Sequence, residues 1–226
     1  MTGGGGDRAG HAPTVVALHG MLGEASDWEF MPWVRGVDLW GWDGDLDSVQ
    51  IDADAVIGYS MGGRLALHAL DQVRAAVIVS AHPGLTEGKG ARLENDLCWA
   101  RKALADDWQD FLAEWHAQPV FARGSFEPDR SGLESRRQAI ASAFERWSLG
   151  RQGNLLPRLA EVQIPVLWVN GSLDEKFVRL GAQACEVLPN GEHVVVDGCG
   201  HRVPWEAPEE FSHLIKQFLS RHSLCK

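Results

Sequence analysis

The sequence lacks any run of about eighteen apolar residues, the length that a membrane-spanning helix requires. Its first residues, MTGGGGDRAGHAP, also lack the apolar core of a signal peptide. We therefore expect a soluble, cytoplasmic protein. The glycines of residues 1–13 predict a flexible N-terminal tail without a function of its own.

Positive charge and cysteine are also scarce. The formal net charge is −10, which argues against nucleic acid or an anionic membrane as a partner, because both reward a basic surface. The four cysteines have no metal-type spacing and are expected to be reduced thiols: Cys98, Cys185, Cys199 and Cys225. With no metal-ligand cluster and no phosphate-cradling loop, we expect no metal and no cofactor.

What the sequence does have is an alternation of two patterns. Short apolar runs rich in β-branched residues predict buried parallel strands at 14–18, 54–59, 75–80, 165–170 and 192–196, with a weaker one near Val37–Trp40. Helical patterns lie at 63–72, 175–188 and 208–222. The alternation predicts an α/β fold with a compact, mostly parallel sheet of about six strands flanked by helices.

One long segment interrupts this alternation. Residues from about 86 to 156 are helical in pattern and rich in tryptophan. We predict one domain over residues 14–226, with this segment inserted between two strands as a helical lid over a pocket. Most of its aromatic residues are expected simply to bury the insertion against the body.

The sequence Gly58-Tyr59-Ser60-Met61-Gly62 fits the pattern G-x-S-x-G, with a predicted strand before it and a predicted helix after it. Such a turn exposes the serine hydroxyl at the carboxyl end of the sheet, beside the amino end of a helix. The alternative is a serine that only caps the helix on a glycine-rich turn. The strand and helix on either side favour a nucleophile elbow.

A catalytic serine needs a histidine and an orienting carboxylate. Asp174 follows one predicted strand and His201 follows the last one. The chain order Ser60, Asp174, His201 is that of the α/β hydrolases. Other candidates are less suitable: Asp197 is expected to shape a turn, and His193, His213 and His222 are expected to be packing or surface residues.

Two further features extend the predicted site. The loop Leu18–Gly23 allows its backbone to approach the serine, so the N–H groups of Met21 and Met61 are the predicted oxyanion hole. Arg64 lies one helical turn after Ser60, and because helical side chains lean toward the amino end, we expect its guanidinium to reach back toward the serine. A neutral ester needs no such cation, although an isolated helix arginine is more often an exposed one.

These motifs resemble one family within the α/β hydrolases, the 2-succinyl-6-hydroxy-2,4-cyclohexadiene-1-carboxylate (SHCHC) synthases of menaquinone biosynthesis. The resemblance runs nearly from end to end, and the helical insertion carries its most specific parts. The matching blocks are LHGMLGEASDW (18–28), GYSMGGRLAL (58–67), HPGL (82–85), WHAQPVFA (115–122), SLGRQGNLLPRL (148–159), GSLDEKF (171–177) and GCGHRVPWEAP (198–208).

The resemblance implies a lyase that expels pyruvate from an enolpyruvyl cyclohexene carboxylate, with Ser60 as a base and no acyl-enzyme. The small substrate would carry several carboxylates, which guanidinium groups bind well. By the same resemblance, the substrate-binding residues are Arg64, Arg92, Tyr59, Trp115, Gln118 and Lys176, with Arg136 or Arg137, of which Arg137 is preferred, as a third arginine.

The chain also departs from the family. It has no room for an N-terminal hairpin, and residues 41–53 are too few for the usual helix, so we expect an uncovered region near Trp40–Trp42 unless a partner chain covers it. Pro204 stands where the family has a second histidine. Two alternatives stay open: a serine carboxylesterase or thioesterase acting on an anionic acyl substrate, and a non-catalytic binding protein. Whether the protein is a monomer or a homo-oligomer is left open.

Overall fold

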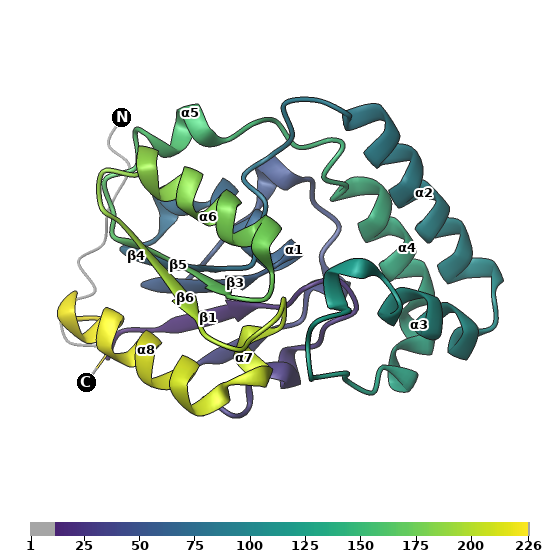
Figure 1. The fold of residues 1–226 in the computed structure, drawn as a ribbon, viewed down its shortest axis with the longest axis horizontal. Coiled ribbons are helices and arrows are strands. Elements are labelled where there is room, and N and C mark those ends of the chain that lie inside the picture. The colour runs from purple at the N-terminus through teal and green to yellow at the C-terminus, as the bar shows by residue number, and fades with distance from the viewer. Residues whose placement is uncertain (1–11, 226) are drawn as a thin grey trace.

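The structure is a computed structural model that describes residues 12–225, so residues 1–11 of the expected tail lie outside the described residues. Its centre is a six-stranded sheet in the order β2-β1-β3-β4-β5-β6, in which every pair is parallel (Figure 1). The strands are β1 (Val15–Leu18), β2 (Arg35–Val37), β3 (Ala55–Tyr59), β4 (Ala75–Val79), β5 (Val166–Gly171) and β6 (Gly191–Val196).

The predicted strands are all present, and the weakest one is shifted. β2 ends at Val37, and Leu39–Gly41 forms a 3-10 helix instead of extended chain, started by Asp38, whose carboxylate accepts the N–H of Trp40. β1, β3, β4 and β5 are buried along their whole length because both sheet faces are covered, which explains their continuous apolar runs.

Helices cover the two faces of the sheet. α1 (Met61–His68) and α6 (Glu175–Val187) pack on one face, and α8 (Pro208–Arg221) packs on the other (Figure 1). Phe211, Ile215 and Phe218 of α8 are completely buried at helical spacing. Two short helices, α5 (Leu156–Leu159) and α7 (Val203–Glu206), lie in the connections.

The helical insertion between β4 and β5 contains α2 (Lys89–Ala105), α3 (Trp108–His116) and α4 (Arg137–Arg146). α2 and α4 pack side by side, and the group lies beyond the carboxyl ends of the strands (Figure 1). Asp107 begins α3 by accepting the N–H groups of Gln109 and Asp110. The insertion is therefore placed above the end of β3 at which Ser60 lies.

The region near Trp40–Trp42, which the sequence predicts to be uncovered, is covered in part. Trp40 is buried, and its indole N–H donates to the carbonyl of Gly23. Trp42 is half-buried and stacks on Trp147, with 4.9 Å between the ring centroids. The insertion reaches this region through Trp147, but a cavity of about 240 Å³ remains between Trp42, Ile51 and the strands β1 and β2, so the aromatic side chains replace the missing helix only in part.

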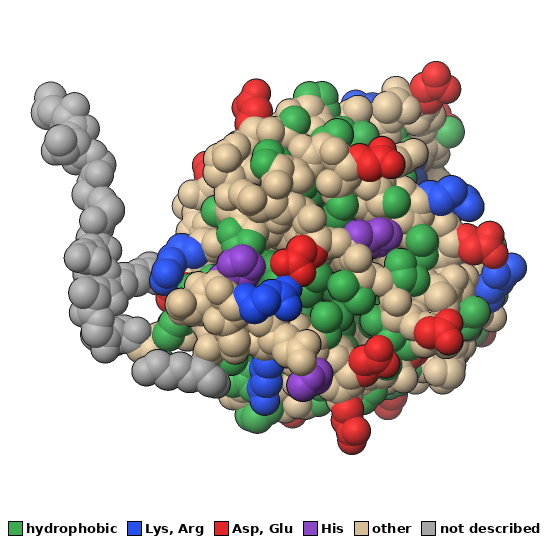
Figure 2. Space-filling model, turned by 60° about the vertical axis from the view of Figure 1, so that its left-hand side comes forward, with side chains coloured by type: hydrophobic (Ala, Val, Ile, Leu, Met, Phe, Trp, Pro, Cys, Tyr) green, Lys and Arg blue, Asp and Glu red, His purple; other side chains and the backbone are tan. Residues whose placement is uncertain are grey.

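Charged side chains are spread over the exterior. On the face shown in Figure 2, lysine and arginine side chains lie among acidic ones and do not gather into a basic surface. No helix of the described residues is long and apolar enough to cross a bilayer.

Candidate active site

Ser60 lies at a sharp turn between β3 and α1. Its φ is +52° and its ψ is −107°, a conformation that costs free energy and that occurs at functional turns. Gly62 makes the turn possible, because a β-carbon there would lie 2.4 Å from the carbonyl oxygen of Leu18 and 2.5 Å from that of His19. The turn therefore presses α1 against the end of β1 and presents the Ser60 hydroxyl to the space above the sheet.

The three predicted triad residues lie together at the carboxyl ends of their strands. His201 Nε2 is 3.1 Å from Ser60 Oγ, and His201 Nδ1 is 2.6 Å from Asp174 Oδ2. In this arrangement Asp174 accepts the Nδ1–H of a neutral imidazole, which leaves Nε2 free to accept the serine proton. The His201 ring is held between Phe121 and Phe177, with ring centroids 5.8 and 4.6 Å away.

Met21 and Met61, the predicted oxyanion-hole residues, both line the space in front of Ser60. Met61 is the first residue of α1, so its N–H has no partner within the helix. The loop before Met21 is fixed by His19, whose Nε2 accepts the N–H of Leu39 and whose Nδ1 contacts the carbonyl of Gly20. Burial lowers the pKa of His19 to about 4, so this ring is neutral.

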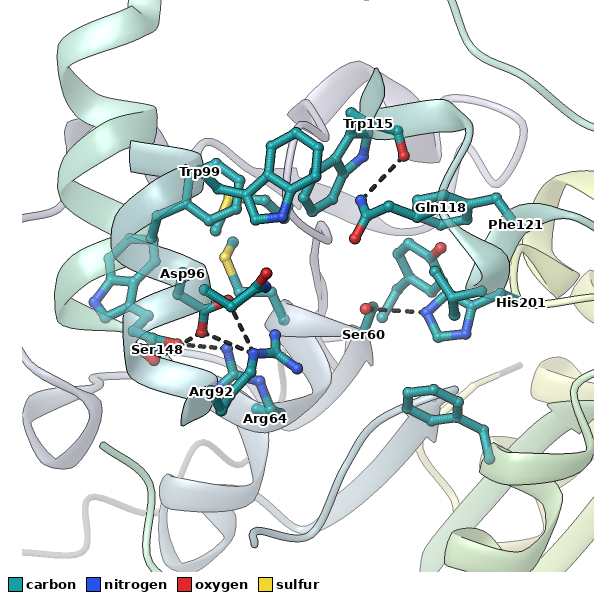
Figure 3. Close-up of a pocket in the computed structure, with 18 of the residues that line it drawn as sticks. Ser60, Arg64, Arg92, Asp96, Trp99, Trp115, Gln118, Phe121, Ser148 and His201 are labelled. Atoms are coloured by element: carbon teal, nitrogen blue, oxygen red, sulfur yellow. Dashed lines mark hydrogen bonds and ion pairs between the residues drawn. The ribbon is translucent and has the colours of Figure 1, made fainter. Parts of the chain in front are cut away.

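A cavity of about 210 Å³ opens in front of the triad, between the sheet and the helical insertion. Figure 3 shows Ser60 and His201 at one end, Arg64 and Arg92 at the other, and Trp99 and Trp115 above them. The lining residues come from both the body and the insertion: Met21, Tyr59, Ser60, Met61, Arg64, Arg92, Asn95, Asp96, Trp99, Trp115, Gln118, Val120, Phe121, Phe144, Trp147, Ser148, Lys176, Phe177 and His201.

Arg64 is a buried cation without an acidic partner among the described residues. Its side chain is only 7% exposed, and its two terminal nitrogens donate to the carbonyl of Trp147 at 2.5 Å and to Gln152 Oε1 at 3.0 Å. Burial, together with the nearby charge of Arg92, lowers its pKa to about 9, although the charge of Asp96 acts in the opposite direction. A guanidinium in this position favours an anionic ligand, which would replace the lost hydration.

Arg92 and Lys176 add positive charge to the cavity. Arg92 is held through its Nε by both carboxylate oxygens of Asp96, at 2.9 Å each, and its side chain is 41% exposed. The positive charge of these side chains also acts on His82. Burial and the charges of Lys176, Arg64 and Arg92 lower its pKa to about 4. The cavity lining thus has three cationic side chains and one carboxylate.

Most of the predicted substrate-binding residues line this cavity. Tyr59 lies beneath it with its ring edge on Trp205, and burial raises the pKa of its hydroxyl. Trp115 and Gln118 lie above it, joined by a hydrogen bond from Gln118 Nε2 to the Trp115 carbonyl. Whether these residues bind substrate stays a prediction.

Arg137, the preferred third arginine, is not among the residues that line the cavity. It donates to the carbonyls of Ala103 and Asp106 at the end of α2, and it stacks on Trp108 at 5.0 Å. These contacts close the C-terminal end of a helix, where a cation is favourable. Arg136 instead pairs with Asp38 on the surface. The structure thus corrects the placement of a third arginine at the cavity.

Sequence reasoning missed a second set of lining residues, mostly from the insertion. Trp99 and Phe144 come from α2 and α4, and Asp96 and Ser148 meet behind Arg92, where the Ser148 hydroxyl donates to Asp96 at 2.7 Å. The sequence holds one signal for Asp96, its position four residues after Arg92 on a predicted helix. Nothing in the sequence brings Ser148 near them.

The competing residues lie outside this arrangement. Asp197 accepts a hydrogen bond from Ser172 Oγ, and His193 contacts Asn170. Among the described residues, no group of three or more His, Cys, Asp or Glu side chains could hold a metal ion. The chemistry available here is that of an acid–base triad beside a cationic pocket.

Comparisons with known proteins agree with this geometry. Residues 6–214 match the Alpha/beta hydrolase family. The chain is 30% identical over 244 residues to the 2-succinyl-6-hydroxy-2,4-cyclohexadiene-1-carboxylate synthase of Pectobacterium atrosepticum, covering 92% of this chain and 94% of the relative. It is 31% identical to the enzyme of the same name from Klebsiella pneumoniae, covering 92% and 94%.

Solved structures share the fold. MenH from S. aureus superposes with a TM-score of 0.78 at 23% identity, over 94% of this chain and 96% of the other. A thermophilic esterase from Thermogutta terrifontis superposes with a TM-score of 0.72 at 17% identity, over 93% and 91%. At these identities the likeness to the solved structures concerns the fold alone.

Proposed function

The chain belongs to the SHCHC synthase family of α/β hydrolases, and we propose that it eliminates pyruvate from 2-succinyl-5-enolpyruvyl-6-hydroxy-3-cyclohexene-1-carboxylate to give SHCHC. The observation that carries this proposal is Arg64. A buried guanidinium that shares a cavity with Ser60 and has no carboxylate partner among the described residues suits a substrate with several carboxylates, and it has no use in the hydrolysis of a neutral ester.

In the proposed reaction Ser60 acts as a base. Its Oγ takes a proton from a ring carbon of the substrate while its own proton passes to His201 Nε2, 3.1 Å away. The C–H electrons form a new ring double bond next to the succinyl carbonyl, the ring double bond already present shifts by one position, and the C–O bond to the enolpyruvyl group breaks. The leaving group departs as the enolate of pyruvate and takes the proton of the His201 imidazolium, which gives the enol. Asp174 stabilises the imidazolium that forms in between, because it accepts the Nδ1–H at 2.6 Å.

The oxyanion hole has a matching role. Removing a proton next to the succinyl carbonyl places negative charge on that carbonyl oxygen. The N–H groups of Met21 and Met61 are the donors that this proposal assigns to it, since both residues line the cavity in front of Ser60. Stabilisation by fixed dipoles is worth several kcal/mol in comparable sites, about 3 kcal/mol for one donor.

The cationic and aromatic side chains of the cavity lie in different places, and this separation would orient the substrate. Arg64, Arg92 and Lys176 would bind the carboxylates, and Trp99 and Trp115 would cover the apolar ring. Two ends of one substrate would thus be held while the reacting carbon faces Ser60. Holding the reactants in this way replaces an entropic cost that a free base would meet in solution.

The runner-up is a serine carboxylesterase or thioesterase for an anionic acyl substrate. One observation favours it: the Ser60 and His201 side chains are already within hydrogen-bond distance, a geometry that equally activates a nucleophile. The two functions differ in the product.

The test is an assay in which the preceding pathway enzyme makes the enolpyruvyl substrate in situ and pyruvate release is followed with and without this protein. The proposal predicts faster release with the wild type and none above background with Ser60→Ala. Hydrolysis of acyl thioesters without accelerated pyruvate release would support the runner-up instead.

A further inference from the structure

One turn of the chain holds the positive end of the cavity. Residues 147–152 follow α4 and contact Arg64 directly, because the Trp147 carbonyl and the Gln152 side chain accept from it. They reach Arg92 only through Asp96, which accepts from Ser148 Oγ and holds Arg92. Gln152 is the least expected of these residues. It is separated from Arg64 by 88 positions and is only 1% exposed.

Both ends of the Gln152 side-chain amide have a hydrogen-bond partner. Its Oε1 accepts from Arg64 at 3.0 Å, and its Nε2 donates to the carbonyl of His82 at 3.2 Å. An amide satisfies both partners because it has an acceptor and a donor at its two ends. This pair of contacts ties the Arg64 guanidinium to the loop that follows β4.

The neutrality of the Gln152 side chain is as informative as its position. A buried arginine is most often paired with a carboxylate, which would compensate its charge. Here both partners of Arg64 are neutral acceptors, a backbone carbonyl and an amide. Asp96, in contrast, is a carboxylate, and it contacts Arg92. The structure thus fixes the orientation of Arg64 without a direct carboxylate contact, although the charge of Asp96 also acts on it from a longer distance.

We propose that Gln152 is a positioning residue that keeps Arg64 aimed into the cavity and out of direct contact with a carboxylate, and so makes it available to a carboxylate of the substrate. This inference rests on the proposed function for the identity of the substrate, but the anion site itself follows from the contacts of Arg64. A carboxylate at position 152 would occupy the guanidinium and reduce the affinity for any anionic ligand.

Gln152→Glu is the informative variant. Glutamate matches glutamine in shape and can still accept from Arg64, but it adds a negative charge about 3.0 Å from it and replaces the N–H that donates to the His82 carbonyl by an acceptor oxygen. The new ion pair stabilises the folded state and the lost donor destabilises it, so we expect a small net change in stability. KM for the anionic substrate should rise by roughly 10- to 100-fold, the effect of losing one charge-assisted contact, with a smaller change in kcat. A purely structural role for Gln152 would move stability and KM in the same direction.

Two further variants support the interpretation. Gln152→Met keeps the side-chain volume and adds no charge, so it should raise KM less than Gln152→Glu although it destabilises the protein more. Gln163→Glu is the matched control, because Gln163 is outside the cavity and its amide contacts only the carbonyl of Glu161. This control should leave KM unchanged.

The experiment combines pyruvate-release kinetics with binding of succinate alone, followed by the fluorescence of the cavity tryptophans, and with urea unfolding. Weaker succinate binding and a raised KM in a stably folded Gln152→Glu protein are the expected results. Wild-type succinate affinity and KM in that variant would overturn the inference, even with pyruvate release intact. If the wild type binds succinate and releases no pyruvate, the proposed function fails while weaker binding by Gln152→Glu still supports the anion site. If the wild type neither binds succinate nor releases pyruvate, both proposals are wrong.

Discussion

Replacing Arg64 by methionine tests the link between the buried cation and the reaction. Methionine retains much of the side-chain length and fills an apolar space, but it cannot bind a carboxylate. A hydrogen bond to a charged group contributes about 1.5 to 3 kcal/mol, which corresponds to roughly 10- to 100-fold in kcat/KM. We therefore expect Arg64→Met to lose pyruvate-releasing kcat/KM by that factor.

The stability of this variant should change less than its activity. The substitution leaves the Trp147 carbonyl and Gln152 Oε1 without their donor, which costs about 1 to 3 kcal/mol for a buried acceptor. It also removes a guanidinium that is buried without a carboxylate, which offsets part of that cost. Urea unfolding of the wild type and the variant measures the balance.

Arg101→Met, on the exposed face of α2, is the matched control and should behave as the wild type. Unchanged pyruvate kinetics in a folded Arg64→Met protein would refute the reasoning. An equal loss of kcat/KM for the hydrolysis of a neutral aryl ester would also refute it, because the substitution would then impair the triad in general.

The remaining predictions concern other parts of the molecule. Asp96→Asn should raise KM several-fold with a smaller effect on kcat, because Arg92 loses the carboxylate that orients it; steady-state kinetics that match the wild type would exclude this role. The pKa of His19 is lowered to about 4, so the unfolded state binds more protons below pH 6.5 and stability falls by up to ~3 kcal/mol as the pH drops from 6.5 to 4. Urea unfolding of His19→Asn should show a smaller fall over this range than the wild type, and an equal one would contradict the assignment. Pyruvate release should survive added chelator, and a loss that zinc or magnesium restores would show a metal requirement.

The catalytic end of the site could be predicted from the sequence because its signals are local. A glycine-flanked serine between a strand and a helix, and polar residues directly after two later strands, identify Ser60, Asp174 and His201. Parallel strands bring their carboxyl ends to one edge, so the order of the chain was enough to place these residues together.

The cationic end could be predicted only in part. Arg64 follows from its spacing on α1, but its partner Gln152 lies 88 residues away in the chain and no periodicity connects them. Arg137 shows the opposite case, since it lies in the insertion and yet closes the end of α2. Which arginine faces a cavity depends on how the helices of the insertion pack, and that packing is tertiary information.

The shortened segment after β2 carried a similar ambiguity. Too few residues for a helix suggested an exposed sheet edge, but Trp42 stacks on Trp147 from the insertion and Trp40 is buried beside His19. Large aromatic side chains bury much surface per residue, so these replace part of the missing helix, while a cavity of about 240 Å³ remains beside Trp42. Composition gave no information on which aromatic residues would meet.

The most direct test of the central claim is the rate of pyruvate release from substrate generated in situ, compared between the wild type and Ser60→Ala. Our account predicts acceleration by the wild type, and release at the background rate with a stably folded Ser60→Ala protein. Release by the wild type no faster than the background, or full acceleration by the folded variant, would contradict a reaction in which Ser60 removes the proton.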